Sequence, residues 1–114
     1  MKGYRGWKVV SYICLMALIW YGCSQEGEDS APATDTVYIS NMQFRPAEVW
    51  INQWDTIVWI NNDIVSHDIT EFPGRTWTSD TIAPGQSWKT TLGDSTSYFC
   101  SIHPTMKGKV SVRQ

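Results

Sequence analysis

The run Ile57-Val58-Trp59-Ile60-Asn61-Asn62-Asp63 joins four β-branched or aromatic residues to three residues that favour turns. Such a run predicts a strand that ends in a turn. The same pattern recurs on both sides of it. Val37 with Ile39, and Val49 with Ile51, alternate with polar neighbours, and the triplet Phe44-Arg45-Pro46 interrupts the pattern between them. Further candidate strands are His67–Glu71, Ser87–Leu92, Ser97–Cys100 and Lys109–Arg113.

Turn signals separate these candidate strands, at Pro73-Gly74, Pro84-Gly85, Gly93-Asp94 and Lys107-Gly108. No stretch of residues 36–114 keeps a helical period for three turns. Seven to eight short strands in about 80 residues predict an all-β domain, an antiparallel sandwich or barrel. We therefore place one such domain at residues 36–114.

The first 35 residues differ in kind from that domain. Lys2, Arg5 and Lys8 precede an apolar run over residues 9–21, the pattern of an export signal, and the run is shorter than a membrane span requires. Gly22-Cys23 then resembles the end of a bacterial lipobox. We expect a signal peptide at residues 1–22 and lipidation at Cys23. The alternative is an uncleaved signal anchor, and both place the domain outside the cytoplasmic membrane.

Residues 23–35 are rich in Ser, Ala, Pro, Gly and acidic residues, a composition typical of a flexible linker. The whole chain of 114 residues carries nine basic and eleven acidic residues. Removal of the signal leaves six basic against eleven acidic residues, a net charge of −5. This acidic balance argues against binding to nucleic acid.

One short segment concentrates the metal-binding residue types. Cys100, His103 and Met106 stand at intervals of three residues, and a second histidine, His67, opens a candidate strand upstream. Because Cys14 and Cys23 lie in the signal and at its end, Cys100 has no disulfide partner. Two imidazoles, one thiolate and a weak thioether form the donor set that selects copper for electron transfer. Zinc is the competitor, but structural zinc sites favour several cysteines.

At these residues the chain resembles the cupredoxins, the small type 1 (blue) copper proteins of the amicyanin, pseudoazurin and plastocyanin kind. The matching landmarks run from about Val37 to Val112: Phe44-x-Pro46, Asp55-Thr56-x-Val58-x-x-Asn61, His67, Ala83-Pro84-Gly85-Gln86-Ser87 and Cys100-x-x-His103-x-x-Met106. The resemblance implies a Greek-key β-sandwich with one copper ion near one end. It implies His67 as the buried upstream ligand, Cys100 as the thiolate, His103 as the ligand at the solvent edge and Met106 as the axial ligand.

Three positions depart from the family pattern. Trp54 stands where the family has Gly before the Asp of its second turn, so this turn is a candidate for a different construction. Asp68 replaces the Asn whose side chain braces the ligand loop, and it is either a brace that only accepts hydrogen bonds or a solvated charge. Ile102 replaces a Pro, and we expect its backbone N–H to reach the Cys100 sulfur.

These features predict a carrier of single electrons, cycling Cu(II)/Cu(I), rather than an enzyme. Four protein ligands leave no open position for a substrate, and two histidines are too few for the second copper centre of a multicopper enzyme. We expect a monomer in the periplasm or cell envelope, lipid-anchored through Cys23, that docks a redox protein such as a cytochrome c or an oxidoreductase near His103. The alternative is a periplasmic copper-binding or delivery protein.

Overall fold

The computed structural model describes residues 34–114, which form eight β-strands and no helix. None of the residues described forms a helix that could cross a membrane. The strands are β1 (Thr34–Ser40), β2 (Gln43–Arg45), β3 (Glu48–Asn52), β4 (Thr56–Asn61), β5 (Thr70–Phe72), β6 (Ser87–Thr91), β7 (Thr96–Phe99) and β8 (Lys107–Arg113). The predicted all-β class and the number of strands are therefore confirmed.

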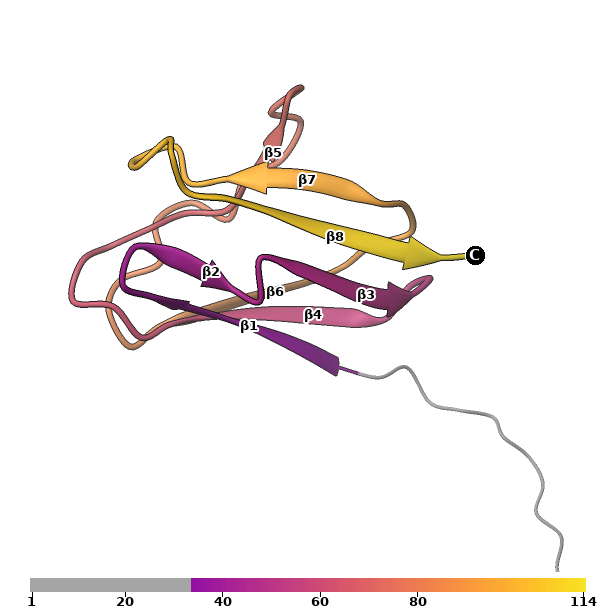
Figure 1. Ribbon diagram of the computed structural model, residues 1–114, viewed down its shortest axis with the longest axis horizontal. Coiled ribbons are helices and arrows are strands. Elements are labelled where there is room, and N and C mark those ends of the chain that lie inside the picture. Colours follow the sequence, from indigo (N-terminus) through magenta and orange to yellow (C-terminus); the bar gives the residue numbers. More distant parts are fainter. Residues whose placement is uncertain (1–33) are drawn as a thin grey trace, which may run out of the picture. The chain divides into compact units, whose positions relative to one another are not determined.

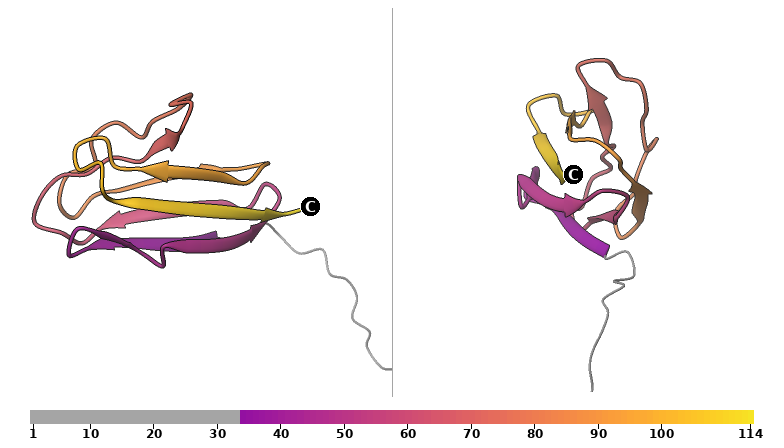
Figure 2. Two further views of the ribbon diagram at one scale, coloured as in Figure 1. Left: turned by 45° about the horizontal axis from the view of Figure 1, so that its top comes forward. Right: turned by 90° about the vertical axis from the view of Figure 1, so that its right-hand side faces the viewer.

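The strands form two four-stranded sheets that face each other, with the orders β2-β1-β4-β6 and β3-β8-β7-β5 (Figures 1 and 2). Each sheet contains one parallel pair, β1 with β4 and β3 with β8. An antiparallel sandwich or barrel was expected, and the two parallel pairs correct this detail. Successive strands change sheet, as β3 and β4 do, so strands that become neighbours can run in the same direction.

The core lies between the sheets and follows from the alternation of the strands. Along β4 the burial alternates with period two, and Ile57 and Trp59 are fully buried. The Trp59 ring meets the ring of Tyr98, from β7 in the opposite sheet, at a centroid distance of 5.3 Å and an angle of 84°. Burial of its hydroxyl raises the pKa of Tyr98 to about 12. Large aromatic rings thus fill the space between the two small sheets.

The two ends of the sandwich carry different structures. The first, which we call the loop end, holds the turn after β1, the segment between β4 and β5, and the loop between β7 and β8 (Figure 1). The second, the entry end, holds the start of β1 and the β3–β4 and β6–β7 turns. Thr34 pairs with Thr56 and Ile39 with Asn61 in the parallel β1–β4 pair, so both strands run from the entry end to the loop end.

The start of β1 at Thr34 lies two residues before the domain boundary expected from the sequence. The signal segment, the lipidation site at Cys23 and most of the linker lie outside the described residues. The order and type of the other elements follow the pattern of the sequence closely. The exceptions are β2, which forms where an interruption was expected, and β5, which starts three residues after His67.

Trp54 builds the β3–β4 turn in a left-handed backbone conformation, with φ 70°. Its N–H donates to the Leu92 carbonyl at 2.8 Å, and the Asp55 N–H donates to the Asn52 carbonyl at 3.1 Å. The turn therefore uses the backbone region that a glycine adopts most easily, even though a tryptophan occupies the position.

Candidate metal centre

Three of the predicted ligands converge at the loop end. One donor atom each from His67, Cys100 and His103 lies within 4.8 Å of the other two. The Cys100 Sγ is 3.8 Å from the His67 Nδ1 and 3.7 Å from the His103 Nδ1. His67 and Cys100 are fully buried, whereas His103 is half-buried. The structure thus places a thiol and two imidazoles around one point, with one imidazole near the surface.

The segment Cys100–Met106 is held in shape by its own backbone. The His103 N–H donates to the Cys100 carbonyl, the Met106 N–H donates to the His103 carbonyl, and the Cys100 N–H donates to the Met106 carbonyl, at 3.2, 2.9 and 3.1 Å. Two consecutive turns therefore close the loop between β7 and β8. Because each turn joins residues three positions apart, it brings the Cys100 and His103 side chains to the same side of the loop.

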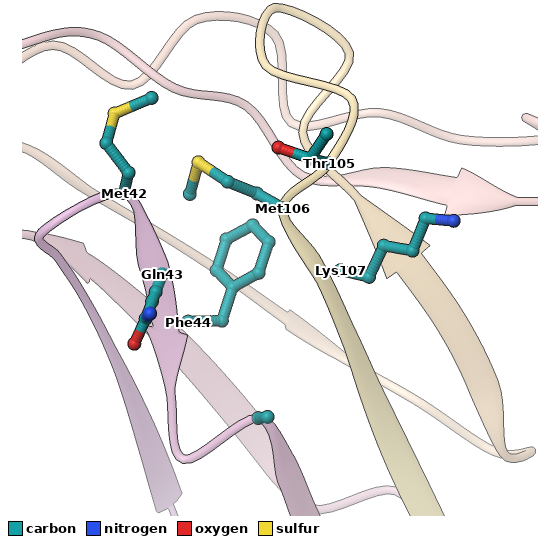
Figure 3. A pocket seen from close by; sticks show the side chains of 7 residues that line it. Met42, Gln43, Phe44, Thr105, Met106 and Lys107 are labelled. Atoms are coloured by element: carbon teal, nitrogen blue, oxygen red, sulfur yellow. The ribbon is translucent and has the colours of Figure 1, made fainter.

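Met106, the fourth predicted ligand, is buried at the end of this loop, just before β8. It lines a cavity of about 170 Å³ together with Met42, which precedes β2, and Phe44, which lies within β2 (Figure 3). Met42, in contrast to Met106, is 42% exposed. The loop end therefore offers one buried thioether, at the end of the loop that carries Cys100 and His103, and a second thioether at the surface.

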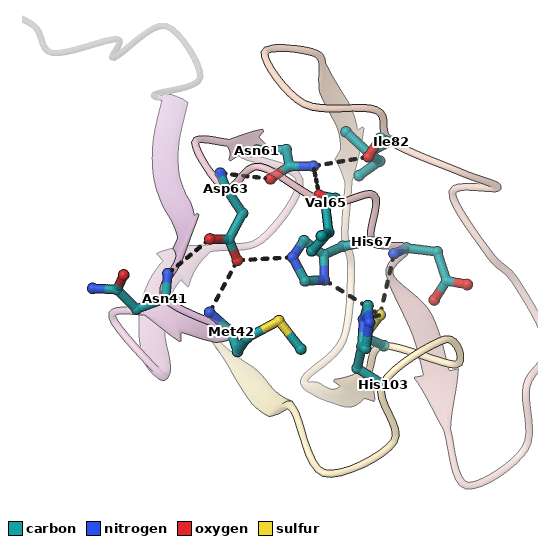
Figure 4. A network of polar contacts seen from close by, with 10 residues as sticks. Asn41, Met42, Asn61, Asp63, Val65, His67, Ile82 and His103 are labelled. Carbon is teal, nitrogen blue, oxygen red and sulfur yellow. Dashed lines mark hydrogen bonds and ion pairs between the residues drawn. The ribbon is translucent and has the colours of Figure 1, made fainter.

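His67 is fixed on both sides before any metal binds. Its backbone pairs with that of Ile82 through two hydrogen bonds, of 3.2 and 2.7 Å. Its Nε2 lies 2.9 Å from a carboxylate oxygen of Asp63, while its Nδ1 faces Cys100 (Figure 4). A histidine ligand that donates its other N–H to a carboxylate is fixed in tautomer and orientation. The geometry favours the tautomer with the proton on Nε2 and a free lone pair on Nδ1.

Asp63 was not predicted from the sequence. Besides His67, its carboxylate accepts hydrogen bonds from the backbone N–H groups of Asn41 at 3.1 Å and Met42 at 2.9 Å. The Met42 N–H foremost, and then His67 and Asn41, lower the pKa of Asp63 below its usual value. Asp63 therefore ties the turn after β1 to the buried histidine. The signal in the sequence was an acidic residue four positions before a candidate ligand, inside a turn.

Asn61 holds the same segment through its side chain. Its side-chain amide donates to the carbonyls of Val65 and Ile82, both at 2.9 Å, and its Oδ1 accepts the Asp63 N–H at 2.9 Å (Figure 4). Asn61 is fully buried, so each of these bonds replaces water that cannot reach it. It fixes both the position of Asp63 and the segment at Ile82 that His67 pairs with.

Asp68 is a brace and not a solvated charge. It is 7% exposed, and its carboxylate accepts hydrogen bonds from the Ser101 N–H at 2.7 Å, the Ser101 hydroxyl, and the Thr70 hydroxyl at 3.1 Å. Because a carboxylate only accepts, the ligand loop provides the donors through Ser101. The two donors of Ser101, which follows Cys100, therefore decide between the two possible roles of Asp68 in favour of the brace.

The hydrogen bond expected from Ile102 to the Cys100 sulfur is not present among residues 34–114. The backbone N–H that reaches this sulfur belongs to Asp68, at 3.4 Å. The segment after His67 runs alongside Cys100, and this places the Asp68 N–H, not that of the loop, against the thiol. Ile102 itself is 46% exposed at the surface beside His103.

This donor set fits copper. A thiolate, two imidazoles and a nearby thioether are the soft and borderline ligands that type 1 copper sites use. The described residues offer no second cysteine for a structural zinc site, since Cys100 is the one free cysteine there. The sulfur also has a hydrogen-bond donor and the buried imidazole has a carboxylate partner, so both ligands are held by outer contacts.

Comparison with known proteins agrees with this chemistry. Residues 33–113 match the family described as copper binding proteins, plastocyanin/azurin family. The chain is 31% identical to amicyanin of Paracoccus versutus over 87 residues, which cover 67% of this chain and 62% of that protein, so the chain spans about three fifths of that relative. It is 32% identical to amicyanin-alpha of Methylorubrum extorquens over 94 residues, 76% of this chain and 79% of that protein.

The fold agrees as well. The structure of the reduced Cu(I) form of an amicyanin mutant at pH 4 superposes with a TM-score of 0.66 and 25% sequence identity, covering 75% of this chain and 87% of that one. The family match and the arrangement of His67, Cys100 and His103 are two separate findings. Both support one type 1 copper ion as the cofactor. The chain belongs to the cupredoxins, the plastocyanin/azurin family of copper-binding proteins.

Proposed function

We propose that this protein carries single electrons between redox proteins of the cell envelope, with His67, Cys100, His103 and Met106 as its copper ligands. Bound copper supplies the Cu(II)/Cu(I) couple. One observation carries the proposal: two of the ligands are fully buried, and a third, His103, is half-buried at the surface. The site is therefore shielded from water on most sides and approaches the surface at one imidazole.

The surface around His103 suits brief contact with a partner. Several apolar residues of the loop end are exposed, namely Met42 (42%), Ile64 (91%), Val65 (38%) and Ile102 (46%). Pro104 and Thr105, which follow His103, are exposed and uncharged. Apolar, uncharged surfaces of this kind dock a partner closely without holding it through many polar bonds, as small transient interfaces do.

The outer contacts of the ligands favour a carrier over an enzyme or a delivery protein. Asp63 and Asp68 hold the ligand segments in place through carboxylate hydrogen bonds. Ligands that are held in one geometry move little between the two oxidation states, which makes electron transfer fast. A delivery protein needs ligands that open to release the metal, and buried, braced residues oppose this.

The test combines voltammetry with electron self-exchange in the copper-loaded protein. We expect a reversible one-electron wave, and exchange between two copies that meet through their His103 surfaces. Ile102→Asp should slow self-exchange about tenfold, which corresponds to about 1.4 kcal/mol of encounter energy, because it places like charges face to face. Tyr38→Asp, at an exposed position on β1, is the matched control and should leave the rate unchanged. Absence of a reversible wave would contradict the proposal.

We further propose that Cys23 is lipidated and anchors the chain, as a monomer, to a membrane outside the cytoplasm. The support is the sequence of the first 23 residues, with its basic start, short apolar run and Gly22-Cys23. Mass spectrometry of the purified full chain tests this directly. A mature N-terminus at a diacylated Cys23 is the expected result, and a retained Met1 would contradict it.

A further inference from the structure

The β3–β4 turn at the entry end, and β3 before it, expose aromatic residues that the copper site does not use. Trp54 is 61% exposed, although it stands in the left-handed region, φ 70°, where a bulky side chain is energetically unfavourable. A glycine would make the same turn without strain. Strain of this kind at an exposed residue is a reason to look for a function of its side chain.

The Trp54 ring is held in a fixed orientation. It lies against Gly93 in the β6–β7 turn, so closely that a Cβ on Gly93 would come within 2.5 Å of the ring. One side of the indole is therefore packed against the protein, while most of the rest faces solvent. The result is a rigid aromatic group that projects from the entry end.

A second exposed aromatic residue lies on β3, the strand that leads into the Trp54 turn, and a cation lies on its neighbour β8. Trp50, on β3, is 53% exposed, and the guanidinium of Arg113, on β8, lies 5.6 Å from the centre of its ring. Asn52 pairs with Arg113 in the β3–β8 register, just before the turn that contains Trp54. We call Trp50, Trp54 and Arg113 the tryptophan surface. Indole rings beside a cation are the side chains that settle at the headgroup level of a bilayer.

The chain that precedes the domain joins it beside this surface. Thr34 pairs with Thr56, which is two residues from Trp54. Ten residues separate Cys23 from Thr34, so an extended chain would hold Thr34 at most about 40 Å from a lipid on Cys23. The seven residues of β1 then cover about 23 Å toward the loop end. The tryptophan surface is thus close to the point of attachment, and the metal ligands lie at the other end of the strands.

We propose that the tryptophan surface rests on the headgroup layer of the membrane to which Cys23 anchors the chain, with the loop end directed away from the bilayer. This inference depends on the proposed anchor. It gives the exposed tryptophans a partner, the lipid interface, and it gives His103 free access to redox partners. A carrier that was only tethered would turn at random, whereas this contact holds it in one orientation.

The experiment uses the full chain, processed to its mature form and reconstituted into phosphatidylcholine vesicles that contain lipids brominated in the acyl chain. Brominated lipid should quench part of the tryptophan emission of the wild type. This quenching should be reduced in Trp50→Ser and in Trp54→Gly, and lost in the double variant, since processing at Cys23 also removes Trp7 and Trp20. Ile64→Ser, which removes the most exposed apolar side chain of the loop end, is the control and should keep the wild-type quenching.

The possible results separate the two proposals. Each variant should keep the visible band of bound copper, which reports a folded domain. Protein that stays in the supernatant when the vesicles are sedimented would refute the anchor and the surface together. Protein that sediments with the vesicles, but whose quenching is the same in the wild type and the double variant, would leave the anchor standing and overturn the tryptophan surface. Adding phosphatidylglycerol distinguishes the roles of indole and cation, since quenching that persists in phosphatidylcholine alone supports the rings as the contact.

Discussion

The loop end and the entry end are built at opposite ends of the same strands, but they are stabilised in different ways. At the loop end, buried and half-buried polar side chains hold the structure: Asn61, Asp63 and Asp68 take part in nine side-chain hydrogen bonds with backbone groups, hydroxyls and an imidazole. At the entry end, the structure is stabilised by backbone hydrogen bonds in the β3–β4 turn and by the packing of the Trp54 ring against Gly93.

The difference shows how one small sandwich can separate two tasks. A metal site needs donor atoms fixed in position, and buried carboxylates that receive several N–H groups provide this. A surface that contacts lipid needs exposed aromatic area, and a strained turn can present it without affecting the core. Substitutions of the ligands, or of the carboxylates that hold them, should therefore change copper chemistry, whereas substitutions at the entry end should leave it unchanged.

The largest effect is expected from Cys100→Ala. Loss of the Cys100 thiolate leaves two imidazoles and a thioether at the site, so the visible thiolate-to-copper absorption should disappear. Copper should also stabilise the variant much less than the wild type, where saturation at a hundred times the dissociation constant adds about 2.7 kcal/mol. Visible spectra and thermal melts with and without Cu(II) measure both. An unchanged spectrum would show that the site is elsewhere.

The next effect concerns the brace between the two ligand segments. Asp68→Ala removes the acceptor of the Ser101 N–H and hydroxyl and of the Thr70 hydroxyl. A buried donor left unpaired costs about 1–3 kcal/mol, so we expect a loss of about 3 kcal/mol in the free energy of unfolding of the metal-free protein. Asp68→Asn keeps one acceptor oxygen and should lose less. Urea unfolding of the two variants decides, and equal stability of Asp68→Ala and wild type would contradict the role of the brace.

A smaller effect is expected on the reduction potential when the charge beside His67 is removed but its hydrogen-bond partner is kept. Asp63→Asn keeps an oxygen for hydrogen bonds but removes a negative charge beside the buried ligand. Because that charge stabilises Cu(II) more than Cu(I), its removal should raise the reduction potential by tens of millivolts, since ~60 mV corresponds to about 1.4 kcal/mol for one electron. Voltammetry measures the shift. Trp54→Gly at the entry end is the control, with no shift expected, and a lower potential for Asp63→Asn would refute the electrostatic argument.

The smallest effect is expected from Ile102→Pro. The hydrogen bond to the Cys100 sulfur comes from the Asp68 N–H, so removing the Ile102 N–H should leave the reduction potential at its wild-type value. The measurement is again voltammetry of the copper-loaded proteins. A potential lower by tens of millivolts would restore Ile102 as the donor to the sulfur.

The residues that could be predicted from sequence are those whose pattern is local. The alternation of Ile57 and Trp59 predicted a strand, and the spacing of Cys100, His103 and Met106 predicted ligands on one loop, because a strand and a short loop are each set by a few consecutive residues. The family resemblance added the place of His67. The structure brings it to Cys100 from 33 positions away.

What the sequence did not reveal depends on contacts between distant segments. The contact of Asp63 with Met42 spans 21 positions, and the contact of Asp68 with Ser101 spans 33. Such pairs arise from sheet topology, and the parallel pairing of β1 with β4 was itself not anticipated. The same reason explains the error at Ile102. The Ile102 N–H is close to the Cys100 sulfur along the chain, but the Asp68 N–H is the one that lies against this sulfur in space.

Titration of the wild-type protein with Cu(II) tests the central claim most directly. If His67, Cys100, His103 and Met106 form one type 1 site, an intense blue absorption should rise linearly with added copper and stop at one copper ion per chain. Zn²⁺ added beforehand at an equal concentration should be displaced by copper, since affinity for nitrogen and sulfur sites is greater for copper. A colourless protein, or absorption that continues to rise beyond one copper ion per chain, would contradict the account.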